Sequence, residues 1–266
     1  MTTTGATGKP CERARDDPSY VLLSAMALSR LRHGLPLWTA AVPPLVLAAL
    51  LAVTAFPASA EVRDAVWDRW LSFTLFLWAA LAPMAAGLFA VGAHQADEEA
   101  KRVMYGYGFP RHRLLAATAA AATALWTASA LLLTALVAAA ALIHGSPGDA
   151  AAVLPGTLLP VLAALPTLVL CLVAAEAWGV AGAACTGVAG LLFGALIGDK
   201  PYWWVFPPAW PTRSVIPFAE TGGLGYFPPG HPMPDPSILP AVAGASAALT
   251  AALLIAGAYY TDRREV

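Results

Sequence analysis

Residues 113–143 read RLLAATAAAATALWTASALLLTALVAAAALI, and after Arg113 this stretch holds no charged side chain. As an α-helix, which rises about 1.5 Å per residue, it is longer than the roughly 30 Å hydrocarbon core of a bilayer. Apolar stretches of the same kind recur at residues 35–56, 70–91, 151–175, 178–197 and 238–260. The sequence therefore predicts an all-α, polytopic integral membrane protein with six transmembrane helices.

The composition of the whole chain agrees with this class. Of its 266 residues, 59% are hydrophobic and 12% are charged, about half the charged share of a soluble domain. The net charge of −1 provides no basic field for nucleic acid, which we exclude as a partner. Cys11, Cys171 and Cys185 have neither the spacing of metal ligands nor that of a disulfide framework. A soluble enzyme is excluded.

The two ends of the chain are predicted to lie on one side of the membrane. Residues 1–18 are polar and are expected to form a disordered cytoplasmic tail, and residues 19–266 a single transmembrane domain. Residues 19–33 mix apolar side chains with Arg30, Arg32 and His33, a pattern typical of an interfacial helix. Six spans return the chain to its starting side, and Lys and Arg concentrate in the segments on that side. We expect a multi-pass protein of the plasma membrane with both termini cytoplasmic.

The expected inner loop, residues 94–113, reads HQADEEAKRVMYGYGFPRHR. Its acidic residues precede Lys101 and Arg102 in a short helical run that Gly106 and Pro110 are expected to end. The pattern predicts a short helix across the cytoplasmic mouth. It fits a solvated loop that sets the topology, or a docking element for a cytoplasmic partner with Tyr105 as an anchor.

Small residues recur along the fifth expected span at Gly187, Gly190, Gly194 and Gly198. A ridge of this kind lets two helices approach closely. The spacing indicates a tight packing surface, either within the chain or across a dimer.

The expected outer segment, residues 199–237, is rich in proline and aromatic residues, including Trp203, Trp204 and Trp210. This composition favours short, re-entrant-like helices that dip into the outer leaflet. The tryptophans form either an aromatic belt that stabilises the fold or an outer lid that contacts an amphipathic substrate. Trp67, at the start of the second span, is likewise expected in the headgroup region.

Two segments resemble a known family. The acidic and then basic run of the inner loop continues as Phe109-Pro110-Arg111-x-Arg113 into a long span. This arrangement resembles the coupling-helix region of ABC type-2 export permeases. Residues 28–34, LSRLRHG, followed by Leu37-Trp38 and by two consecutive prolines, are similar to the start of the lantibiotic-immunity branch, although Ala27 stands where that branch usually has an acidic residue.

The resemblance implies a transmembrane permease subunit that moves a hydrophobic or amphipathic compound, such as an antimicrobial peptide, out of the membrane or cell. Such a subunit pairs with a second permease, of the same or a homologous chain, and with ABC ATPase subunits that bind ATP and Mg. This chain itself is expected to hold no cofactor, metal or catalytic residue. The residues expected to couple it to the ATPase are Glu98, Glu99, Lys101, Arg102, Tyr105 and Phe109.

Two other functions fit parts of the same sequence. Glu98-Glu99-Ala100-Lys101-Arg102 is one residue short of the paired-glutamate and arginine motif of intramembrane CAAX-type proteases. The shortage of polar residues in the spans also fits a non-catalytic membrane anchor or sensor. Copurification of an ATPase would separate both alternatives from a transporter.

Overall fold

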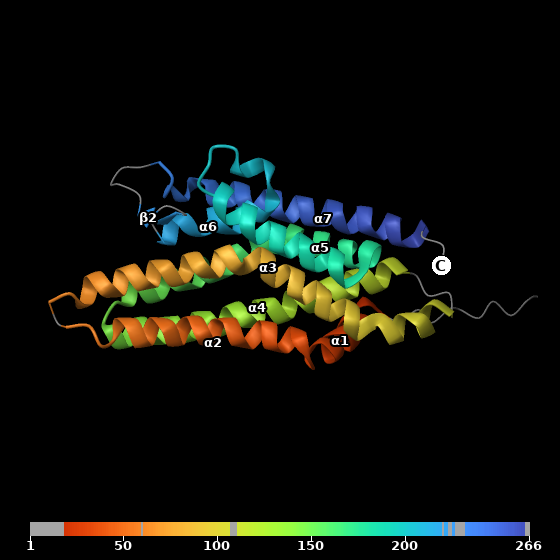
Figure 1. Ribbon diagram of the computed structural model, residues 1–266, viewed down its shortest axis with the longest axis horizontal. Coiled ribbons are helices and arrows are strands. Elements are labelled where there is room, and N and C mark those ends of the chain that lie inside the picture. Colours follow the sequence, from red (N-terminus) through yellow and green to blue (C-terminus); the bar gives the residue numbers. More distant parts are fainter. Residues whose placement is uncertain are drawn as a thin grey trace, which may run out of the picture.

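The computed structural model describes residues 19–59, 61–106, 111–219, 221–222, 225–226 and 232–263. Within these residues, five helices are long and apolar enough to cross a membrane. They lie side by side along the long axis of the molecule (Figure 1). Their bounds are α2 Leu35–Ala55, α3 Arg63–Gly106, α4 Arg111–His144, α5 Pro147–Ile197 and α7 Leu239–Arg263. The predicted all-α fold with long apolar helices is confirmed.

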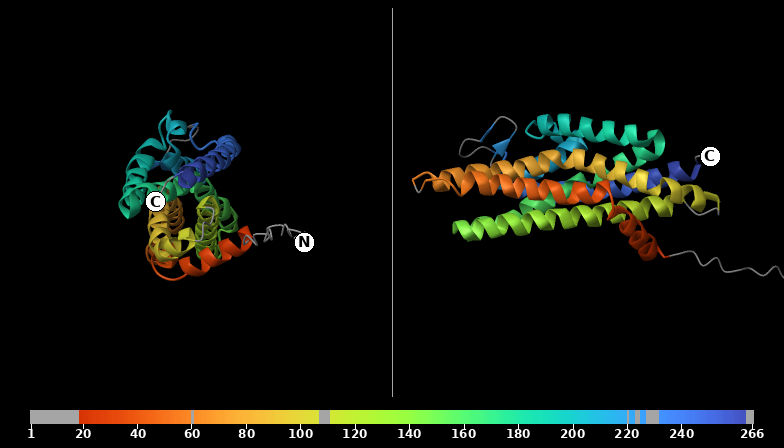
Figure 2. Two further views of the ribbon diagram at one scale, coloured as in Figure 1. Left: turned by 90° about the vertical axis from the view of Figure 1, so that its right-hand side faces the viewer. Right: turned by 60° about the horizontal axis from the view of Figure 1, so that its bottom comes forward.

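The first helix, α1 (Tyr20–Leu31), precedes the long helices and leaves the bundle at an angle (Figure 2). The side chain of Ser19 caps it by accepting a hydrogen bond from the backbone N–H of Leu22, at 3.2 Å. At its other end Gly34 has a φ of 92°, which turns the chain into α2. Residues four apart form the buried face of α1, which packs on α4: Leu23, Ala27 and Leu31.

Helix α3 is longer than its predicted span, residues 70–91. It runs without a break from Arg63 to Gly106, about 66 Å at 1.5 Å per residue. The predicted separate short helix across the mouth is therefore wrong in its boundary, because residues 94–106 continue α3. The physical reason is local: no glycine or proline lies between Gly92 and Gly106, and most residues there are good helix formers.

Helix α5 contains the two stretches that were predicted as spans 151–175 and 178–197. The backbone at Gly179 leaves the helical conformation, with φ 70° and ψ −160°. Residues that carry a side chain rarely adopt a positive φ, so glycine suits this break. The break separates α5 into two apolar halves.

Contacts with α3 show that the chain reverses direction at this break. In the first half of α5 they advance along α3 as the chain advances: Asp149 meets Trp67, then Thr157 meets Trp78. In the second half the order is reversed: Gly187 meets Gly87, then Gly190 meets Pro83. Figure 2 shows the reversal as the turn between the teal parts of the ribbon. The two halves of α5 therefore flank α3 in opposite directions.

The segment between α5 and α7 folds into short elements rather than one long helix. Its helix α6 (Trp210–Ala219) is buried along most of its length and packs against α3 and α5. A two-stranded antiparallel hairpin follows, which the sequence analysis did not predict, with Thr221 opposite Tyr226. The remaining elements are η1 Trp203–Val205, η2 Pro207–Ala209, β1 Thr221–Gly222, β2 Gly225–Tyr226 and η3 Pro236–Ile238.

Candidate functional site

One end of the bundle brings together α1, the last turns of α3, the first turn of α4 and the last turn of α7; we call it the charged end. Figure 1 shows α1 and the C-terminal end of α7 at this same end. The guanidinium carbon of Arg113 lies 5.5 Å from the ring centroid of Tyr20, which links α4 to α1. The charged end is therefore held by contacts between helices that are distant in sequence.

A carboxylate from α7 caps the start of α4. Asp262 accepts a hydrogen bond from the backbone N–H of His112 at 3.2 Å through Oδ1, and its Oδ2 lies 2.8 Å from Nδ1 of His112. The first N–H groups of a helix lack partners within the helix, and their positive dipole attracts a negative charge. Asp262 thus joins the end of α7 to the helix that follows the expected coupling loop.

Five of the six predicted coupling residues fall at the charged end. The backbone of Glu98, Glu99, Lys101, Arg102 and Tyr105 forms the last turns of α3, and their side chains lie outside what the structure describes. Phe109 lies outside the described residues. Their roles remain predictions. Sequence reasoning missed the contact between His112 and Asp262, for which the only local signal was an acidic residue placed after an apolar span.

The glycine ridge packs inside the chain. A side-chain carbon added to Gly187 would lie 2.8 Å from the backbone of Gly87 in α3, and one added to Gly190 would lie 2.8 Å from the Pro83 ring. The last two glycines face the segment before α7: Gly194 meets the carbonyl of Pro208, and Gly198 meets Thr212. Of the two alternatives left open by the spacing, the structure places these four positions at an internal contact.

The three tryptophans of the predicted outer lid have different surroundings. Trp204 is 64% exposed, whereas Trp210 is buried and its indole Nε1 donates to the carbonyl of Trp204 at 3.2 Å. The ring of Trp203 lies under the guanidinium of Arg213, 5.7 Å from centroid to Cζ. Within this group, Trp204 presents the largest exposed ring.

Arg213 is a buried cation that sequence reasoning missed, and its side chain is only 4% exposed. Its Nη1 donates to the carbonyl of Met233 at 2.6 Å, which ties α6 to the chain just before α7. Burial lowers the pKa of Arg213, and the nearby charge of Asp235 acts in the opposite direction. This contact stabilises the segment, and the charge of Arg213 is not exposed to solvent.

The opposite end of the bundle holds a compact aromatic and polar cluster. Trp67 was expected among headgroups; its side chain is fully buried, so its ring contacts neighbouring helices, while its depth in the membrane remains a prediction. Its Nε1 donates to Asp149 at 2.9 Å, and its ring stacks on His144 with centroids 4.5 Å apart. His144 Nδ1 lies 3.0 Å from the Ser146 hydroxyl, and its Nε2 lies 3.6 Å from a carboxylate oxygen of Asp64. The cluster joins the ends of α3, α4 and α5.

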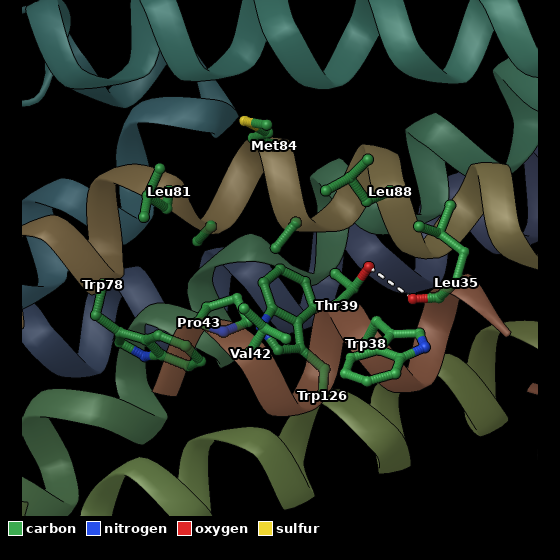
Figure 3. Close-up of a pocket in the computed structure, with 12 residues that line it drawn as sticks. Leu35, Trp38, Thr39, Val42, Pro43, Trp78, Leu81, Met84, Leu88 and Trp126 are labelled. Carbon is green, nitrogen blue, oxygen red and sulfur yellow. Dashed lines mark hydrogen bonds between the residues drawn. The ribbon is translucent and has the colours of Figure 1, made fainter. Parts of the chain in front are cut away.

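An apolar groove of about 350 Å³ lies between α2, α3 and α4 (Figure 3). It is lined by Trp38 and Val42 of α2, by Trp78 and Leu88 of α3, and by Trp126 of α4. The hydroxyl of Thr39, which also borders the groove, donates to a backbone carbonyl of its own helix. The groove therefore offers an apolar surface to an apolar ligand.

Among the residues that the structure describes, no group of three His, Cys, Asp or Glu side chains is placed to hold a metal ion. Comparison with family models, with curated proteins and with solved structures finds no match to this chain. A functional assignment therefore depends on the residues and geometry of the chain itself.

Proposed function

We propose that this chain is the transmembrane permease subunit of an ABC type-2 exporter, in the lantibiotic-immunity branch. It moves a hydrophobic or amphipathic compound outward, and separate ATPase subunits supply the energy. The observation that carries the proposal is the charged end of α3, which extends an apolar helix well beyond the length of a hydrocarbon core. That extension leads directly into the loop whose residues resemble a coupling helix.

The charged end has the connections that a coupling surface requires. A force applied to the last turns of α3 reaches the middle of the bundle through one continuous helix. The helix after the loop, α4, is bonded to α7 by Asp262 and touches α1 at Tyr20. Closure of a bound ATPase would therefore move several helices together, which changes access to the two sides of the membrane.

The proposed orientation has six spans, with both termini and the charged end in the cytoplasm. The reversal at Gly179 supports six crossings, because it divides α5 into two antiparallel apolar halves. The basic residues of the charged end favour the cytoplasmic side. A second permease completes the transport path, and the exposed ring of Trp204 is available to an amphipathic substrate on the other side.

The coupling role is tested with a double charge reversal, Lys101→Glu with Arg102→Glu. We expect the ATPase activity of the complex to continue while export falls at least tenfold, because the contact that transmits closure is lost. Export and ATP hydrolysis are measured in proteoliposomes that contain the complete complex. The control is Arg63→Glu with Arg69→Glu, two exposed cations at the opposite end. Normal export by the Lys101 and Arg102 variant at normal expression would contradict the coupling role.

The partner is tested by purifying the tagged full-length chain from its native membranes. We expect an ABC ATPase to copurify in a fixed ratio. If the chain instead purifies in a complex of reproducible composition that contains no ATPase, the exporter proposal is contradicted. Hydrolysis of a peptide substrate by the chain alone would instead favour the protease alternative.

A further inference from the structure

The apolar groove between α2, α3 and α4 is about as long, measured along the helices, as the hydrocarbon part of one membrane leaflet is thick. On α2 it extends from Leu35 to Pro43, and on α3 from Trp78 to Leu88. At 1.5 Å per residue these stretches measure about 12 and 15 Å. Half of a bilayer's hydrocarbon core is also about 15 Å. A single acyl chain of one leaflet therefore matches the groove in length.

Two of the polar groups beside the groove already have hydrogen-bond partners within the protein. The Thr39 hydroxyl donates to the carbonyl of Leu35 at 3.0 Å, and Figure 3 shows this bond pointing along α2. The indole Nε1 of Trp78 donates to the carbonyl of Thr157, also at 3.0 Å. Neither group requires a polar ligand, so an apolar chain can lie against them without leaving a buried donor unpaired.

A cationic group stands at the end of the groove that meets α1. Arg32 and His33 are exposed and come just before Leu35 in the chain, so the Cα of His33 lies within about 7 Å of that of Leu35. The Nε of Arg32 donates to Nε2 of His33 at 3.2 Å, which orients the guanidinium. In the part of the chain that is described, the two terminal NH₂ groups of Arg32 have no hydrogen-bond partner.

The same end has the marks of a membrane interface. Trp38 lines the groove near this end and is 66% exposed, and tryptophan favours the headgroup level of a bilayer. Along α1, which ends at this corner, the apolar side chains of Val21, Leu22 and Met26 are exposed. The cationic corner therefore lies at the depth of lipid headgroups, with the groove running inward from it.

We propose that this groove binds an anionic glycerophospholipid of the leaflet next to the corner between α1 and α2. One acyl chain lies in the groove, and the phosphate meets the guanidinium of Arg32, whose planar donors match phosphate oxygens. The tail alone confers little preference because every lipid of the bilayer has one. The headgroup contact supplies the preference for negative charge. The proposal requires a membrane-embedded chain but does not depend on transport.

The test measures lipid binding to the purified full-length chain in detergent. Phosphatidylglycerol and phosphatidylcholine with identical acyl chains are titrated in turn, and bound lipid is counted by native mass spectrometry while the Tm is followed. We expect phosphatidylglycerol to bind about fivefold more tightly, which corresponds to about 1 kcal/mol for a basic side chain at an anionic surface. Equal binding of the two lipids would overturn the proposal.

Two pairs of variants separate the headgroup contact from the groove. Arg32→Gln is expected to abolish the preference for phosphatidylglycerol, whereas Arg69→Gln, an exposed cation at the opposite end, retains it. Val42→Trp fills the groove and is expected to lower the binding of both lipids. Its control, Val53→Trp, alters a 73% exposed position of the same helix outside the groove and leaves binding unchanged.

Three other outcomes count against the proposal. A preference that survives Arg32→Gln would remove the headgroup site. Unchanged binding by Val42→Trp would remove the groove as the place of the acyl chain. A loss of oligomer size in Val42→Trp, with lipid binding unaltered, would show that a second copy of the chain occupies the groove. Should Val42→Trp fail to fold, the comparison of Arg32→Gln with Arg69→Gln still decides the result.

Discussion

Trp67 illustrates how much a single side chain can contribute to stability at the end of a helical bundle. Its place at the start of a span is typical of an interfacial aromatic residue, yet the ring is fully buried between helix ends. Its indole N–H, donated to Asp149, and its stacking on His144 join three helices at one point. A buried donor that loses its partner costs far more than an exposed one.

Trp67→Phe tests this contribution. Phenylalanine keeps an aromatic ring against His144 but cannot donate to Asp149, whose carboxylate loses one partner. We expect the free energy of unfolding to fall by about 1–3 kcal/mol, seen as a lower Tm of the purified protein in detergent. The control is Trp178→Phe, at a position 75% exposed, which should leave the Tm unchanged. Equal effects of the two changes would contradict the role of Trp67.

Asp235 is a second single residue that contributes to stability, and its contribution depends on pH. Its carboxylate accepts hydrogen bonds from the backbone N–H and hydroxyl of Ser237, and Arg213 adds a favourable charge, so the pKa of Asp235 lies below its ordinary value of 3.8. A lowered pKa means that the carboxylate stabilises the fold above the ordinary value and that this contribution is lost as the pH falls through the lowered pKa.

The Ser237 amide reports this titration directly. In protein labelled with ¹⁵N-serine, we expect the amide signal of Ser237 to shift with a midpoint below pH 3.8. Asp235→Ala should abolish that shift, and Glu61→Ala, an exposed carboxylate elsewhere, should preserve it. A midpoint above the ordinary value would show that the cap does not stabilise the charged form.

At the scale of elements, the decisive contact is that between α3 and the second half of α5. These two helices meet backbone to backbone where Gly87 faces Gly187, and small residues permit such an approach in membrane helices. Pro83 in α3 meets the same ridge one turn away, at Gly190. The contact positions the returning half of α5 against the helix that carries the proposed coupling residues.

Gly187→Val tests the close approach. The added side chain would meet the backbone of Gly87 and force the helices apart, so we expect a loss of about 1–3 kcal/mol, a typical value for overpacking. Thermal unfolding and gel filtration in detergent measure the effect. Gly244→Val is the control, because an added carbon there has no neighbour within 4 Å. A Gly187 variant as stable as the control would show that the helices do not touch there.

At the scale of the whole molecule, the reversal at Gly179 decides at which end of the bundle each connection lies. Val173 in the first half of α5 contacts Gly257 of α7, which places this part of α5 toward the charged end. The connection before α5, together with Gly148 in the first turn of α5, lies with the cluster of Trp67 and Asp149 at the opposite end. The two connections should therefore be accessible from opposite sides.

Cysteine labelling in intact cells tests this arrangement. In a background without Cys11, Cys171 and Cys185, we expect Gly148→Cys to react with a membrane-impermeant reagent. Trp178→Cys should react only after the membrane is permeabilised, because the proposed orientation puts the turn at Gly179 on the cytoplasmic side. Labelling of both positions in intact cells would contradict the six-span arrangement.

The candidate site could be predicted from the sequence only in part. Helix propensity and charge order are local, so they located the charged run of residues 97–102, although not its continuity with α3. The partner of His112 could not be found in this way. Asp262 lies far along the chain, and whether it meets α4 depends on how α7 packs.

The sequence by itself determined that this chain is all-α and built on long apolar helices, because apolar length and the scarcity of charge are properties of each stretch alone. Only the tertiary structure decided that the glycine ridge faces α3, that Trp67 is buried, and that α2, α3 and α4 enclose a groove. Apolar faces in a membrane protein carry little pattern, since lipid and neighbouring helices are equally apolar. Shape complementarity between whole helices therefore selects their neighbours, and that information exists only once the helices are assembled.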